Sequence, residues 1–126
     1  DSKSTSYSSS IEMLKENNNI YWLLGGLPKK GDKFNLSKKY HQNIRGFIFG
    51  ANQKKFLLDL KKKIKLKKFS DLKKALDELF RDIKKDNSPK KTILFSPAAA
   101  SFDNFKNFED RGQYFNKLIK RYIYVK

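Results

Sequence analysis

Hydrophobic residues occur along this chain in short continuous runs and in stripes at helical spacing. A continuous apolar run spans residues 20–24, and largely apolar runs span Ile44–Phe49 and Thr92–Phe95, each bounded by turn residues. Runs of this kind are typical of strands that are buried on both faces of a parallel sheet. Residues 64–69 alternate apolar side chains with lysine, which predicts a strand at the edge of the sheet, where charge discourages pairing with other chains.

Helical spacing is clearest in the stretch that follows Ser70. Apolar residues recur there every three or four positions, and Ser70 is suited to cap the helix that they predict. The apolar residues of this stripe are Leu72, Leu76, Leu79, Phe80 and Ile83. Weaker patterns predict helices within residues 4–17, 53–60 and 109–119, and a helical turn at residues 36–41.

Strands that alternate with helices predict an α/β fold, with a mostly parallel sheet and helices on both faces. The expected fold is Rossmann-like, although the chain has no G-x-G-x-x-G dinucleotide fingerprint. With 126 residues the chain suits a single domain. Ligands of such sheets lie beyond the carboxyl ends of the strands, so we expect the loops at Gly25, at Gly50 and at residues 96–101 to share one rim.

Composition excludes several classes of protein. The chain has no cysteine, which rules out a disulfide framework and a thiolate metal site. Its apolar runs are far shorter than the ~20 residues that cross a bilayer, and no signal-peptide pattern opens it. We therefore expect a cytoplasmic monomer without a membrane partner. The single histidine, His41, cannot form a metal site by itself.

The formal net charge of +16 raises nucleic acid as a partner. Only four of the 29 basic residues are arginine, however, and proteins that read bases or phosphates with two parallel hydrogen bonds favour arginine. A solvated coat of lysine explains the charge more simply, because charge runs usually lie on solvated faces. We therefore expect no specific nucleic-acid partner, and a basic nucleic-acid-binding α/β module stays as the alternative.

Residues 92–112 combine a predicted strand end with small residues and regularly spaced rings. The apolar run stops at Pro97, because proline lacks the amide donor of an interior strand. Alanines and Ser101 follow, and backbone N–H groups in such a stretch can come close to a ligand. Three phenylalanines then recur at a spacing of three, at Phe102, Phe105 and Phe108, and for Phe105 packing in the core is the simpler interpretation.

The pattern S-P-A-A-A-S-F-D-x-F-x-N-F-x-x-R-G in this stretch resembles a signature near the carboxyl end of the Mur ligase family. It is similar to the branch that adds D-glutamate to UDP-N-acetylmuramoyl-L-alanine. Two further stretches resemble the same enzymes in the same order, D-S-K-S-T at residues 1–5 and L-L-G-G-L-P-K at residues 23–29. The resemblance implies an excised carboxyl-terminal domain, with a nucleotide-sugar domain and a central ATP-binding domain preceding it in the parent protein.

The resemblance assigns five residues to D-glutamate. It implies that Lys29, helped by Thr5, faces one carboxylate of D-glutamate. Ser101 and the backbone N–H of Phe108 hold the other carboxylate, and Phe102 belongs to the same substrate-binding set. A lysine after two glycines supplies a point charge, whereas the serine supplies a hydroxyl donor.

The resemblance also assigns two residues to the nucleotide. It implies that Asp1 contacts the ribose hydroxyls and that Lys3 lies near the bound nucleotide. The chain departs from the family pattern at three positions: Ser4 replaces an alanine, Ser6 an asparagine, and Ala99 a residue that is often cysteine.

The implied reaction is ATP-dependent amide formation with Mg²⁺, in which an acyl phosphate of UDP-N-acetylmuramoyl-L-alanine is attacked by the amine of D-glutamate. The chain contains no G-x-x-x-x-G-K-[ST] phosphate loop, so the catalytic machinery is expected in the central domain. We therefore expect no catalytic residue in this chain and no turnover by the chain alone. A stand-alone fold with no retained ligand is a third hypothesis.

Overall fold

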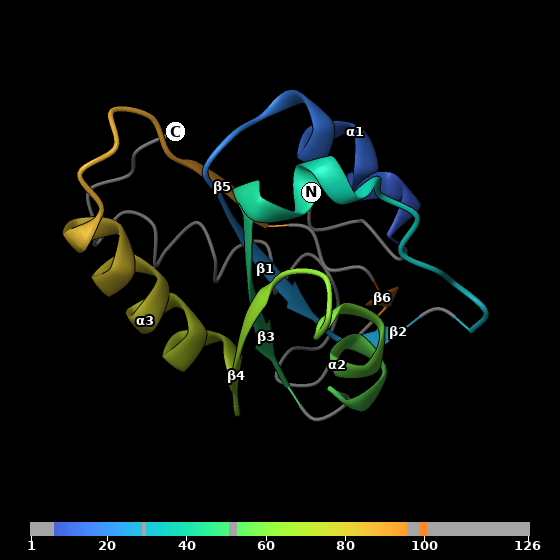
Figure 1. Cartoon of the computed structure of the whole chain (residues 1–126). Coiled ribbons are helices and arrows are strands. Elements are labelled where there is room, and N and C mark those ends of the chain that lie inside the picture. Colours follow the sequence, from blue (N-terminus) through green and yellow to red (C-terminus); the bar gives the residue numbers. More distant parts are fainter. Residues whose placement is uncertain (1–6, 29, 51–52, 96–98, 101–126) are drawn as a thin grey trace.

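Four parallel strands form the central sheet of the computed structural model (Figure 1). The structure describes residues 7–28, 30–50, 53–95 and 99–100. Within these residues the strands lie in the order β4-β3-β1-β5. Their bounds are Ile20–Gly25 for β1, Ile44–Phe49 for β3, Lys65–Phe69 for β4 and Thr92–Phe95 for β5.

The helices cover both faces of this sheet, with α3 on one face and α1 and α2 on the other (Figure 1). Their bounds are Ser8–Glu16 for α1, Lys54–Leu60 for α2 and Leu72–Lys85 for α3, and a 3-10 helix, η1, spans Lys38–Asn43. A two-stranded antiparallel sheet joins β2, Leu27–Pro28, to β6, Ala99–Ala100. The predicted α/β class, with a mostly parallel sheet between helices, is confirmed.

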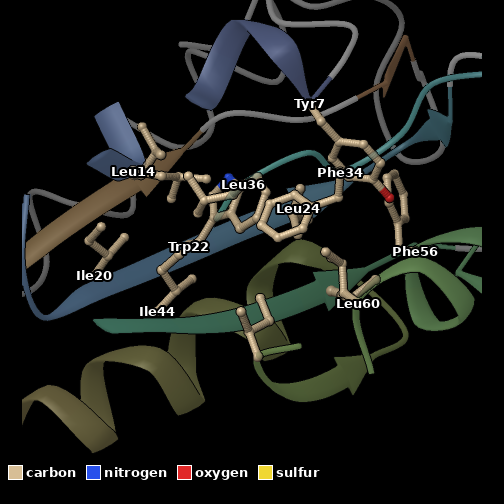
Figure 2. Packing of buried hydrophobic residues seen from close by; sticks show 13 residues of the cluster. Tyr7, Leu14, Ile20, Trp22, Leu24, Phe34, Leu36, Ile44, Phe56 and Leu60 are labelled. Atoms are coloured by element: carbon tan, nitrogen blue, oxygen red, sulfur yellow. The ribbon is translucent and has the colours of Figure 1, made fainter. Parts of the chain in front are cut away.

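Strand β1 is buried along its whole length, as its continuous apolar run predicts. Successive side chains of a strand point to opposite faces, so Ile20, Trp22 and Leu24 pack on one side while Tyr21 and Leu23 pack on the other. Figure 2 shows the first of these clusters, in which Trp22 and Leu24 meet residues of α1, α2 and the loop before η1. Each face therefore has its own core.

The predicted stripe of α3 packs on the second face, as the helical spacing indicates. Leu72, Leu76 and Leu79 are buried there against Phe47 of β3 and Leu23 of β1. The predicted edge strand is also confirmed, because β4 lies at one end of the strand order. Its lysines do not interrupt the core, since the strand is half-buried or exposed along its length.

One predicted helix cap is wrong. Asp71, not Ser70, caps α3, and its carboxylate accepts a hydrogen bond of 2.9 Å from the backbone N–H of Lys74. Helix α1 lies within the predicted residues 4–17, and Tyr7, which precedes it, is buried in the core. The helix predicted within residues 109–119 and the final strand or tail at residues 122–125 lie outside the described residues.

The carboxyl end of β1 is shaped by a close contact between a glycine and a ring. Gly25 pairs with Phe49 in the parallel ladder, and a Cβ added to Gly25 would lie 2.3 Å from Cζ of Phe49. Atoms at that distance overlap, so the ring occupies the space that any other side chain would need. The next residue, Gly26, has a φ of 100°, which L side chains rarely adopt.

We expect Gly25→Ala to lower the free energy of unfolding by about 1–3 kcal/mol, because the new methyl group overpacks the site against Phe49. Urea denaturation of the two proteins measures the difference. The double variant Gly25→Ala with Phe49→Leu should lose less free energy of unfolding than the two single variants lose in sum, because the smaller leucine side chain leaves space for the new methyl group. Additive losses in the double variant would contradict the proposed clash.

Candidate functional site

The order of the strands creates a switch point beside β1. After β1 the chain adds β3 and then β4 on one side, whereas β5 returns to the other side of β1. The carboxyl ends of β1 and β5 therefore lie next to each other at one edge of the sheet. Open α/β sheets bind ligands in the crevice at such a point, outside the carboxyl ends of the strands.

A short antiparallel ribbon joins the two loops at this switch point. Leu27 pairs with Ala100 and Pro28 pairs with Ala99. Figure 1 shows β2 and β6 side by side beyond the carboxyl end of β1. Main-chain pairing thus ties the segment after β1 to the segment after β5, although more than 70 residues separate them in the sequence.

A polar network ties the start of the described chain to the same region. The backbone N–H of Tyr7 donates a hydrogen bond of 2.6 Å to the carboxylate of Asp32, and its hydroxyl donates one of 2.9 Å to Asp59. Lys55 donates to Asp59 at 2.6 Å and to the backbone carbonyl of Asp32 at 2.8 Å. Together these contacts join α1, the loop after β2, and α2.

Aromatic packing holds the ring of Tyr7 in the core beneath this network. The ring makes edge-on contacts with Trp22, Phe34 and Phe56 at centroid distances of 6.4, 5.7 and 6.1 Å. Figure 2 shows Tyr7 close to Phe34 and Phe56. Burial, followed by the hydrogen bond to Asp59, raises the pKa of the Tyr7 hydroxyl well above its usual value.

All seven residues that the sequence assigns to ligands lie outside the described residues. They are Asp1, Lys3, Thr5, Lys29, Ser101, Phe102 and Phe108. Described residues near three of them in the chain nevertheless make contacts between distant segments. Pro28, which precedes Lys29, pairs with Ala99, and Ala100 precedes Ser101. Tyr7, two positions after Thr5, is bonded to Asp32 in the loop that begins with Lys29.

Sequence reasoning missed the Tyr7, Asp32, Lys55 and Asp59 network. Its hydrogen bonds to Tyr7 join residues that are 25 and 52 positions apart. Only the ion pair between Lys55 and Asp59 has a local signal, because the two residues are four positions apart on a helix. The rest depends on how the loop after β2 folds back on the sheet.

Within the described residues, no group of three or more acidic, histidine or cysteine side chains could hold a metal ion. Within the same residues, no helix is both long enough and apolar enough to cross a bilayer.

Curated proteins named UDP-N-acetylmuramoylalanine–D-glutamate ligase match nearly the whole chain. The protein of Rickettsia felis is 35% identical over 122 residues, which are 97% of this chain and 27% of the relative. The proteins of Rhodospirillum rubrum and Agrobacterium fabrum are 33% and 34% identical over 94% and 91% of the chain. The resemblance to the Mur ligases is confirmed.

The similarity concerns one part of these enzymes. The chain spans about a quarter of the length of the curated relatives that it matches, which is consistent with a carboxyl-terminal fragment of the D-glutamate-adding (MurD) branch. No family model matches the chain.

Replacing Tyr7 by phenylalanine tests the network beside the switch point. We expect Tyr7→Phe to lower the free energy of unfolding at neutral pH by about 1.5–3 kcal/mol, because the variant loses a hydrogen bond to a carboxylate. The folded protein keeps the hydroxyl protonated, since its pKa is raised, whereas an unfolded tyrosine ionises near pH ~10. The difference between the two proteins should therefore shrink above that pH.

Urea denaturation from pH 7 to pH 11 measures this difference. Tyr40→Phe is the matched control, because the Tyr40 hydroxyl has no recorded hydrogen bond to the described residues. If Tyr7→Phe and Tyr40→Phe lowered the free energy of unfolding equally, the stabilising role of the Tyr7 hydroxyl would be contradicted.

Proposed function

We propose that this chain is the D-glutamate-binding domain of a ligase that adds D-glutamate to UDP-N-acetylmuramoyl-L-alanine in peptidoglycan synthesis. The pairing of β2 with β6 at the switch point is the observation that supports this most directly. It joins the segment that leads to Lys29 with the segment that leads to Ser101. The names of the matching relatives support the same reaction.

An antiparallel ribbon suits a ligand with two separated carboxylates. Lys29 follows the Pro28–Ala99 pair, whereas Ser101 follows the Leu27–Ala100 pair at the other end of the ribbon. In an antiparallel ladder the two strands run in opposite directions, so Pro28 and Ala100, the residues before Lys29 and Ser101, lie in different pairs of the ribbon. We propose that Lys29 and Thr5 bind one carboxylate and that Ser101 and the N–H of Phe108 bind the other.

Binding both carboxylates leaves the amine of D-glutamate free to react. In the proposed reaction, a carboxylate oxygen of the nucleotide-sugar substrate takes the γ-phosphoryl group of ATP, and ADP leaves. The amine of D-glutamate then attacks the acyl carbon, and inorganic phosphate leaves with the loss of one proton from nitrogen. The domain contributes by holding the amine in line with that carbon, which is positional catalysis.

The remaining assignments belong to the same proposal. Asp1 and Lys3 contact the nucleotide, and Phe102 lies in the D-glutamate set. Mg²⁺ and the phosphates of ATP are held by the central domain, since the chain has no phosphate loop. Because the reaction consumes ATP and a nucleotide-activated sugar, we place the protein in the cytoplasm.

Substitution of the two carboxylate partners in the full-length ligase tests the proposal. Ser101→Ala should raise the Michaelis constant for D-glutamate about tenfold to a hundredfold, because one hydrogen bond to a charged group contributes about 1.5–3 kcal/mol. Lys29→Ala should raise it further, since it also removes the charge opposite a carboxylate. The constants for ATP and the nucleotide sugar should change little.

Lys62→Ala is the control for this experiment, because Lys62 is an exposed lysine in the turn after α2, far along the chain from the proposed ligands. Its kinetics should match those of the unaltered enzyme. An unchanged Michaelis constant for D-glutamate in Ser101→Ala would contradict the assignment of these residues. So would a rise in Lys62→Ala as large as the rise in Lys29→Ala.

We also expect the 126-residue chain by itself to make no amide product from ATP, D-glutamate and UDP-N-acetylmuramoyl-L-alanine. The physical reason is the missing phosphate loop. A phosphate-release assay on the purified chain, run beside the full-length enzyme, measures this. Product formation by the chain alone would show that the catalytic groups lie within it.

A further inference from the structure

A basic groove lies along the β4 edge of the sheet. It runs between η1, the amino end of β3, strand β4 and the turn after α2, with a volume of about 910 Å³. Six lysines and Arg45 line it, and its lining contains no carboxylate. The lysines are Lys38, Lys61, Lys62, Lys63, Lys65 and Lys68. The groove is therefore a concave surface of one charge sign.

Charge is balanced at Lys67 of β4 but not along the groove. Lys67, which faces α3, is paired with Glu78 at 2.7 Å and with Asp82 at 3.0 Å. Within the part of the chain that the structure describes, no ion pair is recorded for the exposed groove residues Lys61, Lys62, Lys65 and Lys68. Like charges gathered without counter-charges repel one another, and a bound polyanion would remove that repulsion.

The shape and the chemistry of the groove restrict the polyanion that fits. Apolar side chains, Ile44, Leu57, Ile64 and Leu66, line it between the lysines. A single nucleic-acid strand carries one negative charge per nucleotide and flat apolar bases, so it can meet both surfaces. A flat bilayer would contact the rim of the groove but not its floor, so it fits the concave surface less well.

An acidic peptide fits less well. A peptide that extended the sheet at β4 would place alternate side chains on both faces. On the α3 face these side chains would meet the carboxylates of Glu78 and Asp82, which lie beside Lys67. Acidic residues of such a peptide would be repelled there.

The groove residues also indicate how such a strand is read. Arg45, the one arginine of the groove, is occupied by a hydrogen bond of 2.7 Å to Asn19 and by the ring of Tyr21. The ring of His41 is bonded to the carbonyl of Leu36 at 2.9 Å and packs on Phe34. Neither is free to read a base edge or to stack on one, so the lysines act as point charges.

We propose that this groove binds single-stranded nucleic acid through its phosphates, weakly and independently of sequence. The groove meets β3 at its amino end, at Ile44 and Arg45, and follows β4 as far as Lys68. The proposal is independent of D-glutamate binding, because its residues are separate from those assigned to the ligase site.

The test measures binding of fluorescein-labelled dT20 and of a mixed-sequence 20-mer by anisotropy over a range of salt. The groove variant carries Lys61→Gln, Lys62→Gln, Lys65→Gln and Lys68→Gln. The control variant carries Lys74→Gln, Lys84→Gln, Lys85→Gln and Lys90→Gln, which removes the same charge from exposed lysines outside the groove. Circular dichroism checks that both variants keep the fold.

Both oligonucleotides should bind the unaltered protein equally, and affinity should fall steeply with salt. The groove variant should lower the slope of log K against log salt by about 3, since each phosphate neutralised on a single strand contributes about 0.7. The control variant should keep most of the slope. An equal decrease of the slope in both variants would assign binding to the net charge of the protein and overturn the proposal.

Two competitors test the class of ligand. Vesicles of phosphatidylglycerol and poly-glutamate, matched to the oligonucleotide in total charge, should displace labelled dT20 only weakly. If either competitor displaced labelled dT20 as effectively as unlabelled dT20 does, and bound the groove variant more weakly, the groove would be assigned to a membrane or to an acidic protein. That result would overturn the nucleic-acid proposal.

Discussion

The burial of β1 on both faces is the constraint on which the rest of the structure depends. Every residue of this strand is buried, so other elements must cover both of its faces. Helix α3 covers one face, whereas α1, α2 and the loop with Phe34 and Leu36 cover the other. The neighbours of β1 in the sheet, β3 and β5, satisfy its backbone groups. Each helix is thus positioned by the face of β1 that it covers.

The same central strand separates two surfaces with different chemistry. At its carboxyl end, Gly25 lies under the ring of Phe49 and Gly26 turns the chain into the ribbon of β2 and β6. At the amino end of its neighbour β3, a lysine-lined groove opens without carboxylates. A parallel sheet makes this division natural, because all its carboxyl ends share one edge and all its amino ends the other.

Charge is distributed unevenly over the surface between these ends. The acids Asp77, Glu78 and Asp82 of α3 pair with Lys67, Lys73 and Arg81. Exposed pairs of this kind contribute little to stability. Within the described residues, no ion pair joins the groove lysines Lys61, Lys62, Lys65 and Lys68 to a carboxylate.

The sequence alone predicts the elements whose burial follows a simple period. The continuous runs of β1, β3 and β5 and the stripe of α3 are found where expected, because a strand or helix with one or two buried faces must repeat its apolar residues every two or about 3.6 positions. The resemblance to the Mur ligases was also readable from residues 92–112 without any coordinates. The cap prediction was wrong at the start of α3, where Asp71 rather than Ser70 is the cap.

Only the tertiary structure decided which distant segments meet. Leu27 and Ala100 have no pattern in common, yet they pair because β1 and β5 are neighbours in the sheet. The bonds from Tyr7 to Asp32 and Asp59 arise in the same way, since the chain folds the three residues over one face of β1. The groove likewise gathers Lys38 with Lys61 and Lys65 from three segments. Periodicity records which face of an element is buried, whereas the identity of its neighbours depends on the order of the strands, which no local spacing encodes.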